Sequence, residues 1–168
     1  MKKTTPYFIL IAFLLAADQL TKWLVTKKVA LHSAVPVIPG FFNITHIHNR
    51  GAIFGAFGRI GSPFVSIALT LASLTALGLV IYYFVKTPVS ERGLKIALSL
   101  ILAGALGNLA DRLGRGYVVD FLDFYVNRWH WPFFNVADSS ITVGAGLLLY
   151  FLFIRRPKCS LSSCGLGR

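Results

Sequence analysis

The sequence predicts an all-α membrane protein in which four transmembrane helices carry a small β-sheet on one side of the bilayer. The composition is the first reason, because 55% of the residues are hydrophobic and 14% are charged, whereas a soluble domain carries about 25% charged residues. The mean hydropathy of +0.68 agrees with a chain that is solvated largely by lipid. The second reason is that long apolar segments recur along the 168 residues. We treat residues 1–168 as one integral membrane domain.

Each of the four apolar segments is long enough to cross a bilayer. The second and fourth contain 22 residues each, and 22 residues at 1.5 Å per residue extend about 33 Å, the thickness of one hydrocarbon core. The first segment also has the features of a removable signal peptide, since Lys2 and Lys3 precede an apolar run that ends in Leu-Ala-Ala. The expected spans are residues 7–26, 64–85, 94–113 and 133–154.

The basic residues predict the orientation. The net charge of +11 would indicate nucleic-acid binding in a soluble protein, but here the Lys and Arg residues lie mostly in short stretches between apolar runs. Residues 1–6, 86–95 and 155–168 hold nine of them in 30 positions, against seven in 60 positions on the other side. By the positive-inside rule both termini are cytoplasmic. We therefore expect membrane lipids, and no nucleic acid, as partners.

The two regions on the outer side differ in composition. Residues 27–63 include a β-prone run from Phe41 to Asn49, which predicts short strands lying on the membrane surface. Residues 114–132 are expected to form a loop or short helix. Their aromatic residues predict a belt at the membrane interface, and these are Tyr117, Phe121, Phe124, Tyr125, Trp129 and Trp131.

The aspartates are the most informative residues. A carboxylate within a transmembrane segment costs about 2.5–3.5 kcal/mol on insertion scales, which makes it a functional candidate. All of the aspartates fall on the outer half of the predicted topology, so they can gather at one depth near the outer headgroups. They are Asp18, Asp111, Asp120, Asp123 and Asp138.

Their surroundings separate these aspartates by role. Asp18 lies four residues before Lys22 on one helical face, which favours a structural ion pair. Asp111 is compatible with a site or with an interfacial anchor, and Asp123 is interpreted as a loop carboxylate. Asp120 and Asp138 have apolar neighbours and no basic residue within a helical turn. We therefore favour a functional role for these last two.

Two neighbouring carboxylates have a definite chemistry. Ionisation of both carboxyl groups is energetically unfavourable, so one of them keeps its proton and its pKa rises. The ionised member can then take a proton from a water that attacks a carbonyl, while the protonated member donates. This chemistry needs no metal and no other cofactor.

Other sites and functions compete with this interpretation. His46, His48 and His130 could form a zinc site, although no His-Glu-x-x-His motif is present. Ser139 or Ser140 could act as a nucleophile, but the sequence motifs that usually surround such a serine are absent. A small proton-coupled transporter, with Asp18, Asp138 and Arg112 as relay groups, is the alternative from a different functional class.

Five short blocks resemble the bacterial lipoprotein signal peptidases (type II signal peptidases), in the order in which that family carries them. Each block is weak evidence alone, but the five together are specific and cover nearly the whole chain. The blocks are DQLTK at 18–22, NRGAIF at 49–54, GALGNLADR at 104–112, VVDF at 118–121 and FNVAD at 134–138. Ala103 departs from the family, in which many members have a second glycine at this position.

The resemblance implies an intramembrane aspartic endopeptidase with Asp120 and Asp138 as its catalytic pair. Such an enzyme acts in the bacterial cytoplasmic (inner) membrane, near its periplasmic face, on prolipoproteins that carry a diacylglyceryl cysteine, and cleaves before that cysteine. Substrate binding or orientation of the pair would fall to Asn49, Asn108, Arg112 and Asn135. Structural support would come from Asp18, Lys22 and Asp111. We expect a monomer without a cofactor.

Overall fold

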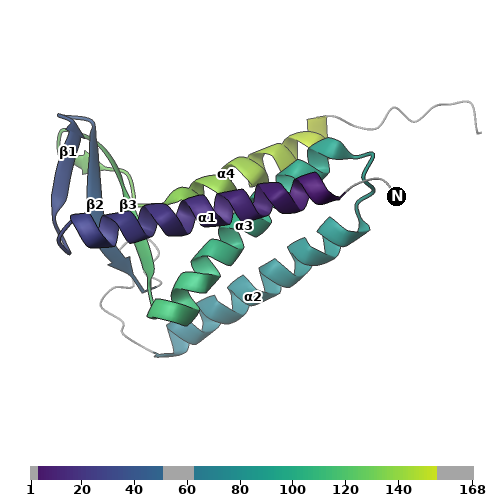
Figure 1. The fold of residues 1–168 in the computed structure, drawn as a ribbon, viewed down its shortest axis with the longest axis horizontal. Coiled ribbons are helices and arrows are strands. Elements are labelled where there is room, and N and C mark those ends of the chain that lie inside the picture. Colours follow the sequence, from purple (N-terminus) through teal and green to yellow (C-terminus); the bar gives the residue numbers. More distant parts are fainter. Residues whose placement is uncertain (1–3, 51–62, 155–168) are drawn as a thin grey trace, which may run out of the picture.

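The computed structural model describes residues 4–50 and 63–154, excluding the side chains of residues 63–70 and 72. All four apolar segments are helical, and a small sheet lies at one end of the helices (Figure 1). The helices are α1 (Thr5–Lys28), α2 (Pro63–Lys86), α3 (Arg92–Arg115) and α4 (Val136–Leu149), with a π-helical segment η1 (Tyr150–Ile154) after α4. The strands are β1 (Ala34–Ile38), β2 (Phe42–Asn49), β3 (Val118–Val126) and β4 (Trp129–His130).

Three of these helices meet the requirements for crossing a membrane. They are α1, α3 and the continuous helix formed by α4 and η1, each apolar and at least 19 residues long. In α2, the continuous stretch with described side chains, Ser73–Lys86, is also apolar but is shorter than these three helices. The chain is therefore built as a multi-pass membrane protein, and the count of four spans stays a prediction.

Small residues let the helices approach closely. Helix α3 contacts the other three helices, and its closest partner is α4. A Cβ on Gly107 would lie 2.6 Å from Oδ2 of Asp18, and a Cβ on Gly104 would overlap the carbonyl oxygen of Ala137. On α4, a Cβ on Gly144 would lie 2.8 Å from the Ala97 carbonyl oxygen. These glycines therefore allow α3 to pack closely against α1 and α4.

The sheet is antiparallel and follows the order β1-β2-β3-β4. Strand β2 confirms the strand predicted within 41–49. The prediction of a loop or short helix in 114–132 is wrong, because much of that region forms β3 and β4. The run Val-Val-Asp-Phe-Leu-Asp-Phe-Tyr-Val is rich in β-branched and aromatic residues, which suit a pleated surface, and it pairs with β2 through contacts such as Ile47 with Asp120.

Two apolar cores hold these parts together. The larger one lies among the helices and includes Ile11, Leu77 and Leu102. The smaller one joins the end of α1 to β3 and consists mainly of Val25, Val29, Val119 and Phe121. Because Asp120 lies between two residues of this smaller core, the packing of β3 against α1 fixes the position of its carboxyl group.

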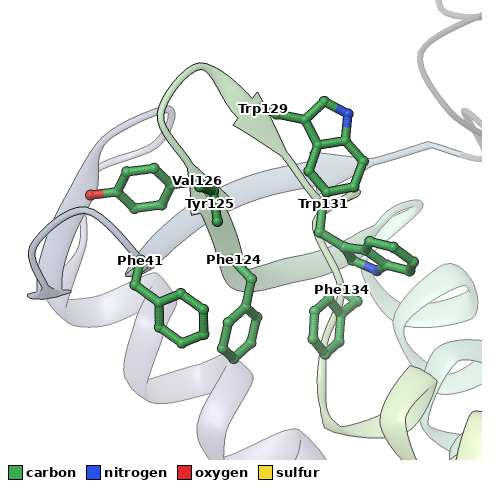
Figure 2. A pocket seen from close by; sticks show the side chains of 7 residues that line it. All are labelled: Phe41, Phe124, Tyr125, Val126, Trp129, Trp131 and Phe134. Carbon is green, nitrogen blue, oxygen red and sulfur yellow. The ribbon is translucent and has the colours of Figure 1, made fainter.

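The aromatic residues on the sheet form a pocket rather than a simple belt. Figure 2 shows Trp129 and Trp131 beside Phe124, Phe134 and further side chains, around a cavity of about 360 Å³. Trp129 is 65% exposed and Trp131 55%, in keeping with an interfacial location. Phe121 was expected in the same belt and is instead buried in the core beneath the sheet, because its place in β3 turns its side chain toward α1.

Candidate active site

The first turn of α4 fixes one of the candidate carboxylates. Asn135 is the N-cap residue, and its side-chain oxygen accepts a hydrogen bond from the Asp138 backbone N–H at 3.0 Å. In return, Oδ2 of Asp138 accepts a hydrogen bond from the Asn135 backbone N–H at 3.3 Å. This reciprocal capping box uses the three-residue spacing of the two side chains, and it sets the direction of the Asp138 carboxyl group.

Asp120 approaches the same point from the sheet. It is 2% exposed, and both carboxyl oxygens accept hydrogen bonds from amides. Asn49 Nδ2 donates to Oδ2 at 2.9 Å, and Asn135 Nδ2 donates to Oδ1 at 2.8 Å. Among the residues that the structure describes, no basic side chain forms an ion pair with Asp120 or Asp138.

Two asparagines connect the carboxylates. Asn108 Nδ2 donates to Oδ1 of Asp138 at 2.7 Å, and the Oδ1 atom of Asn108 lies 3.3 Å from Asn135 Nδ2. Since Asn135 also donates to Asp120, a continuous network runs from Asp120 through Asn135 and Asn108 to Asp138. The structure thus brings together both predicted catalytic residues and three of the four predicted orienting residues.

The environment of Asp120 favours its protonated form. The pKa of Asp120 is raised from 3.8 to about 6, mainly by burial and also by the negative charge of Asp138. The hydrogen bonds from Asn49 and Asn135 and the charge of Lys22 limit this rise. Desolvation and a neighbouring like charge both disfavour ionisation. A proton can therefore reside on this carboxyl group near neutral pH.

A buried ion-pair cluster lies directly behind the network. Lys22 Nζ is 2.8 Å from Oδ2 of Asp18 and 2.8 Å from Oδ2 of Asp111, and it donates to Asn108 Oδ1 at 3.1 Å. Oδ1 of Asp18 accepts a hydrogen bond from the Ala137 backbone N–H at 2.9 Å, so α1 helps to cap α4. The predicted Asp18–Lys22 pair is confirmed, and the alternative of Asp111 as an interfacial anchor is wrong because Asp111 is 1% exposed.

An apolar cavity opens beside this network. It measures about 300 Å³ and is lined by α2, α3 and α4, and Asp138, Asn108 and Arg112 are among its few polar residues. Within the described part of the chain, the Arg112 guanidinium has no hydrogen-bond or ion-pair partner. It is therefore available to a ligand that enters the cavity next to Asp138.

The remaining candidates are placed elsewhere. Asp123, interpreted as a loop carboxylate, is instead a buried residue of β3 that accepts hydrogen bonds from Asn43 at 2.9 Å and His130 at 2.7 Å. His130 is thus engaged there, and no three metal-ligating side chains come together within residues 4–50 and 63–154. Ser139 and Ser140 donate their hydroxyls to backbone carbonyls of the preceding turn of α4.

One contributor was missed by the sequence-based reasoning. Gln19 Nε2 donates at 3.2 Å to Asp18, to Asp111 and to the Gly107 carbonyl oxygen, so it ties α1 to α3 beside Lys22. Its place within the 18–22 block was the available signal. The block indicated roles for Asp18 and Lys22, but its spacing did not show that Gln19 faces α3.

Apolar helices around two carboxylates that asparagines connect, with a small sheet at one end, are features expected of a membrane-embedded enzyme. The solved structures agree with this class. A bacterial membrane enzyme determined by the in meso method at 1.9 Å resolution superposes with a TM-score of 0.78 and 32% sequence identity, covering 89% of this chain and 94% of that one.

The profile of the signal peptidase (SPase) II family matches residues 10–154, and the chain belongs to this family of membrane peptidases. The lipoprotein signal peptidase of Syntrophus aciditrophicus is 46% identical over 159 residues, which covers 94% of this chain and 98% of the relative. The lipoprotein signal peptidase of Burkholderia mallei is 50% identical over 137 residues, covering 79% and 78%.

Proposed function

We propose that this protein is an aspartic endopeptidase that removes signal peptides from diacylglyceryl-modified prolipoproteins, with Asp120 and Asp138 as the catalytic pair. The substrate class is supported by the relatives, which are lipoprotein signal peptidases that match over most of the chain. The observation that carries the mechanism is the amide network that joins the two carboxylates and leaves both without a cationic partner among the described residues.

In this mechanism the pair shares one proton. The ionised carboxylate removes a proton from a water molecule, and the resulting hydroxide attacks the carbonyl carbon of the scissile peptide bond. The protonated carboxyl donates to the carbonyl oxygen and later a proton reaches the leaving amine. Asn49, Asn108 and Asn135 hold the carboxylates in place by donating amide hydrogens, so they add no competing charge.

The cavity beside Asp138 suits an apolar substrate. A signal peptide is an apolar helix, and the cavity is open between α2, α3 and α4 with mainly apolar walls. Arg112 offers donors to the carbonyl oxygens of the bound peptide, because a guanidinium carries five N–H groups and accepts none. We assign Arg112 to substrate binding, and the ion-pair cluster of Asp18, Lys22 and Asp111 to structural support.

The proposed location is the bacterial inner membrane, with four spans, both termini in the cytoplasm and the pair near the periplasmic face. The density of basic residues supports this orientation. Trp129 of β4 and Trp131, which follows β4, are both exposed and line the same pocket (Figure 2), as expected for a surface at the level of the headgroups. A single-domain monomer is sufficient for the proposed site, since every residue in it comes from one chain.

Substitution of the two aspartates tests the proposal. Asp120→Asn and Asp138→Asn are each expected to lower cleavage of a diacylglyceryl prolipoprotein peptide by several orders of magnitude, because members of one catalytic unit fail singly. Asp123→Asn is the matched control, since it changes another buried carboxylate of β3 that lies outside the network, and it should keep activity within a few fold. Near-normal cleavage by either of the first two variants would refute the assignment, and proton flux in proteoliposomes would favour the transporter alternative.

A further inference from the structure

Two histidines on β2 face each other outside the network described above. His46 and His48 are two positions apart, and their Nε2 atoms lie 3.2 Å from each other. Their ring centroids are 5.0 Å apart with the rings tilted by 68°. Asn49, the residue that contacts Asp120, is the next residue along the same strand, so this pair is close in sequence to the proposed site but takes no part in it.

The hydrogen bonds fix the protonation of His46. Its Nδ1 lies 2.9 Å from the Val29 carbonyl oxygen, and a carbonyl can only accept, so Nδ1 carries the hydrogen. In the neutral ring, Nε2 is then a bare lone pair. Metal-binding histidines have this arrangement, in which the second ring nitrogen donates to a backbone carbonyl and thereby orients the ring.

The second histidine is held in place by its contacts on the sheet. His48 stacks on Tyr117 with ring centroids 3.7 Å apart. Its Nε2 atom faces the lone pair of His46 Nε2 at 3.2 Å, so Nε2 of His48 carries the hydrogen of this hydrogen bond.

We propose that His46 and His48 form a site for Zn²⁺ or a similar divalent cation with an affinity for imidazole nitrogen. Two zinc–nitrogen bonds of about 2.05 Å at the tetrahedral angle place the nitrogens about 3.3 Å apart, close to the distance between the two Nε2 atoms. On binding, the proton that His48 donates to His46 moves to Nδ1 of His48, and both lone pairs face the ion. Water completes the coordination, because no group of three His, Cys, Asp or Glu side chains comes together among the described residues.

The role of such an ion is to fix β2 rather than to catalyse. The alternation of side chains along a strand directs His46 and His48 to one face and Ile47 and Asn49 to the other. A cation at the histidine pair leaves the contact between Asn49 and Asp120 intact. It would cross-link two positions of the strand that holds this contact, and it would stabilise the folded state by binding it preferentially.

Calorimetric titration of the full chain with ZnCl₂ tests the proposal, with no polyhistidine tag, in detergent at pH 7.5. The expected result is one Zn²⁺ per chain with micromolar affinity, and affinity about tenfold lower or worse in His48→Gln, which loses one ligand. His130→Gln is the matched control, since it removes a histidine of the same sheet that is paired with Asp123, and it should bind as the unaltered chain does. No binding by the unaltered chain, or an equal loss in His130→Gln, would overturn the proposal.

If the His48→Gln variant fails to fold, a second measurement on the unaltered chain tests the site. Diethyl pyrocarbonate modifies accessible imidazole nitrogens, and mass spectrometry locates the modified residues. In the unaltered chain, Zn²⁺ should slow modification of His48 about tenfold and leave the rate at His130 unchanged. Equal rates at His48 with and without Zn²⁺ would contradict the site.

Discussion

Asp120→Asn is expected to make the folded protein more stable while it abolishes the proposed activity. The unaltered carboxyl group has a pKa of about 6 in the folded protein, against an ordinary value of 3.8. A difference of about two units corresponds to about 3 kcal/mol, which is the destabilisation that ionised Asp120 brings above pH 6. Asparagine imitates the protonated acid and removes this penalty.

The same substitution disturbs a hydrogen bond, and this offsets part of the gain in stability. Asn135 can still donate to the new side-chain oxygen, but Asn49 must turn its amide, because its Nδ2 would otherwise face another donor. One disturbed hydrogen bond costs about 1 kcal/mol. The net gain is therefore about 2 kcal/mol at pH 7.5, or about 4–8 °C in Tm for a chain of this size.

The pH dependence separates this explanation from a general packing effect. A raised carboxyl pKa destabilises the fold only where the unfolded group is ionised, so the advantage of Asp120→Asn develops between pH 3.8 and 6 and is constant above that range. Thermal unfolding in detergent at pH 7.5 and pH 4.5 measures it, and the gain should be nearly absent at the lower pH. A variant less stable than the unaltered protein at pH 7.5, or a gain equal at both values, would refute the reasoning.

Three further predictions concern the support of the site and its chemistry. Lys22→Met should destabilise the protein by about 3–5 kcal/mol, because Asp18 would remain buried without a cation and Asp111 would keep only Arg115, and the yield of folded protein in detergent measures this loss. Gly107→Ala should lower the Tm, since its Cβ would lie 2.6 Å from Asp18, whereas Gly78→Ala on α2 meets nothing within 4 Å and should be neutral or slightly stabilising. Removal of metals with EDTA should leave the cleavage rate unchanged, and a loss that Zn²⁺ restores equally in the unaltered chain and in His48→Gln would contradict the aspartic mechanism.

The helices and the two central aspartates were predictable because their signals are local. Long apolar runs identify helices by length alone, and a carboxylate among apolar residues is costly wherever the chain folds. The capping box of Asn135 and Asp138 likewise depends on a spacing of three residues. These features need no knowledge of distant contacts, so composition and spacing were sufficient.

The outer region after α3 was not predictable in the same way. Strand β3 is defined by its pairing with β2, which joins Ile47 to Asp120 across a long stretch of sequence. A short apolar run does not distinguish a strand from a helix by its periodicity. The burial of Asp123 has the same origin, because its partners Asn43 and His130 come from two other strands.

The cations near the network are matched by other carboxylates, which leaves the proposed catalytic pair without a cationic partner. Lys22 and Arg115 are matched by Asp18 and Asp111, so the cluster behind the network is close to neutral. Its cations are occupied there and do not form ion pairs with Asp120, whose pKa stays raised. Among the described residues, a side-chain hydrogen bond from Lys22 reaches Asn108, an uncharged amide that in turn donates to Asp138. Rigid support and the proposed sharing of a proton are therefore compatible in one site, because amides separate the ion pairs from the proposed catalytic pair.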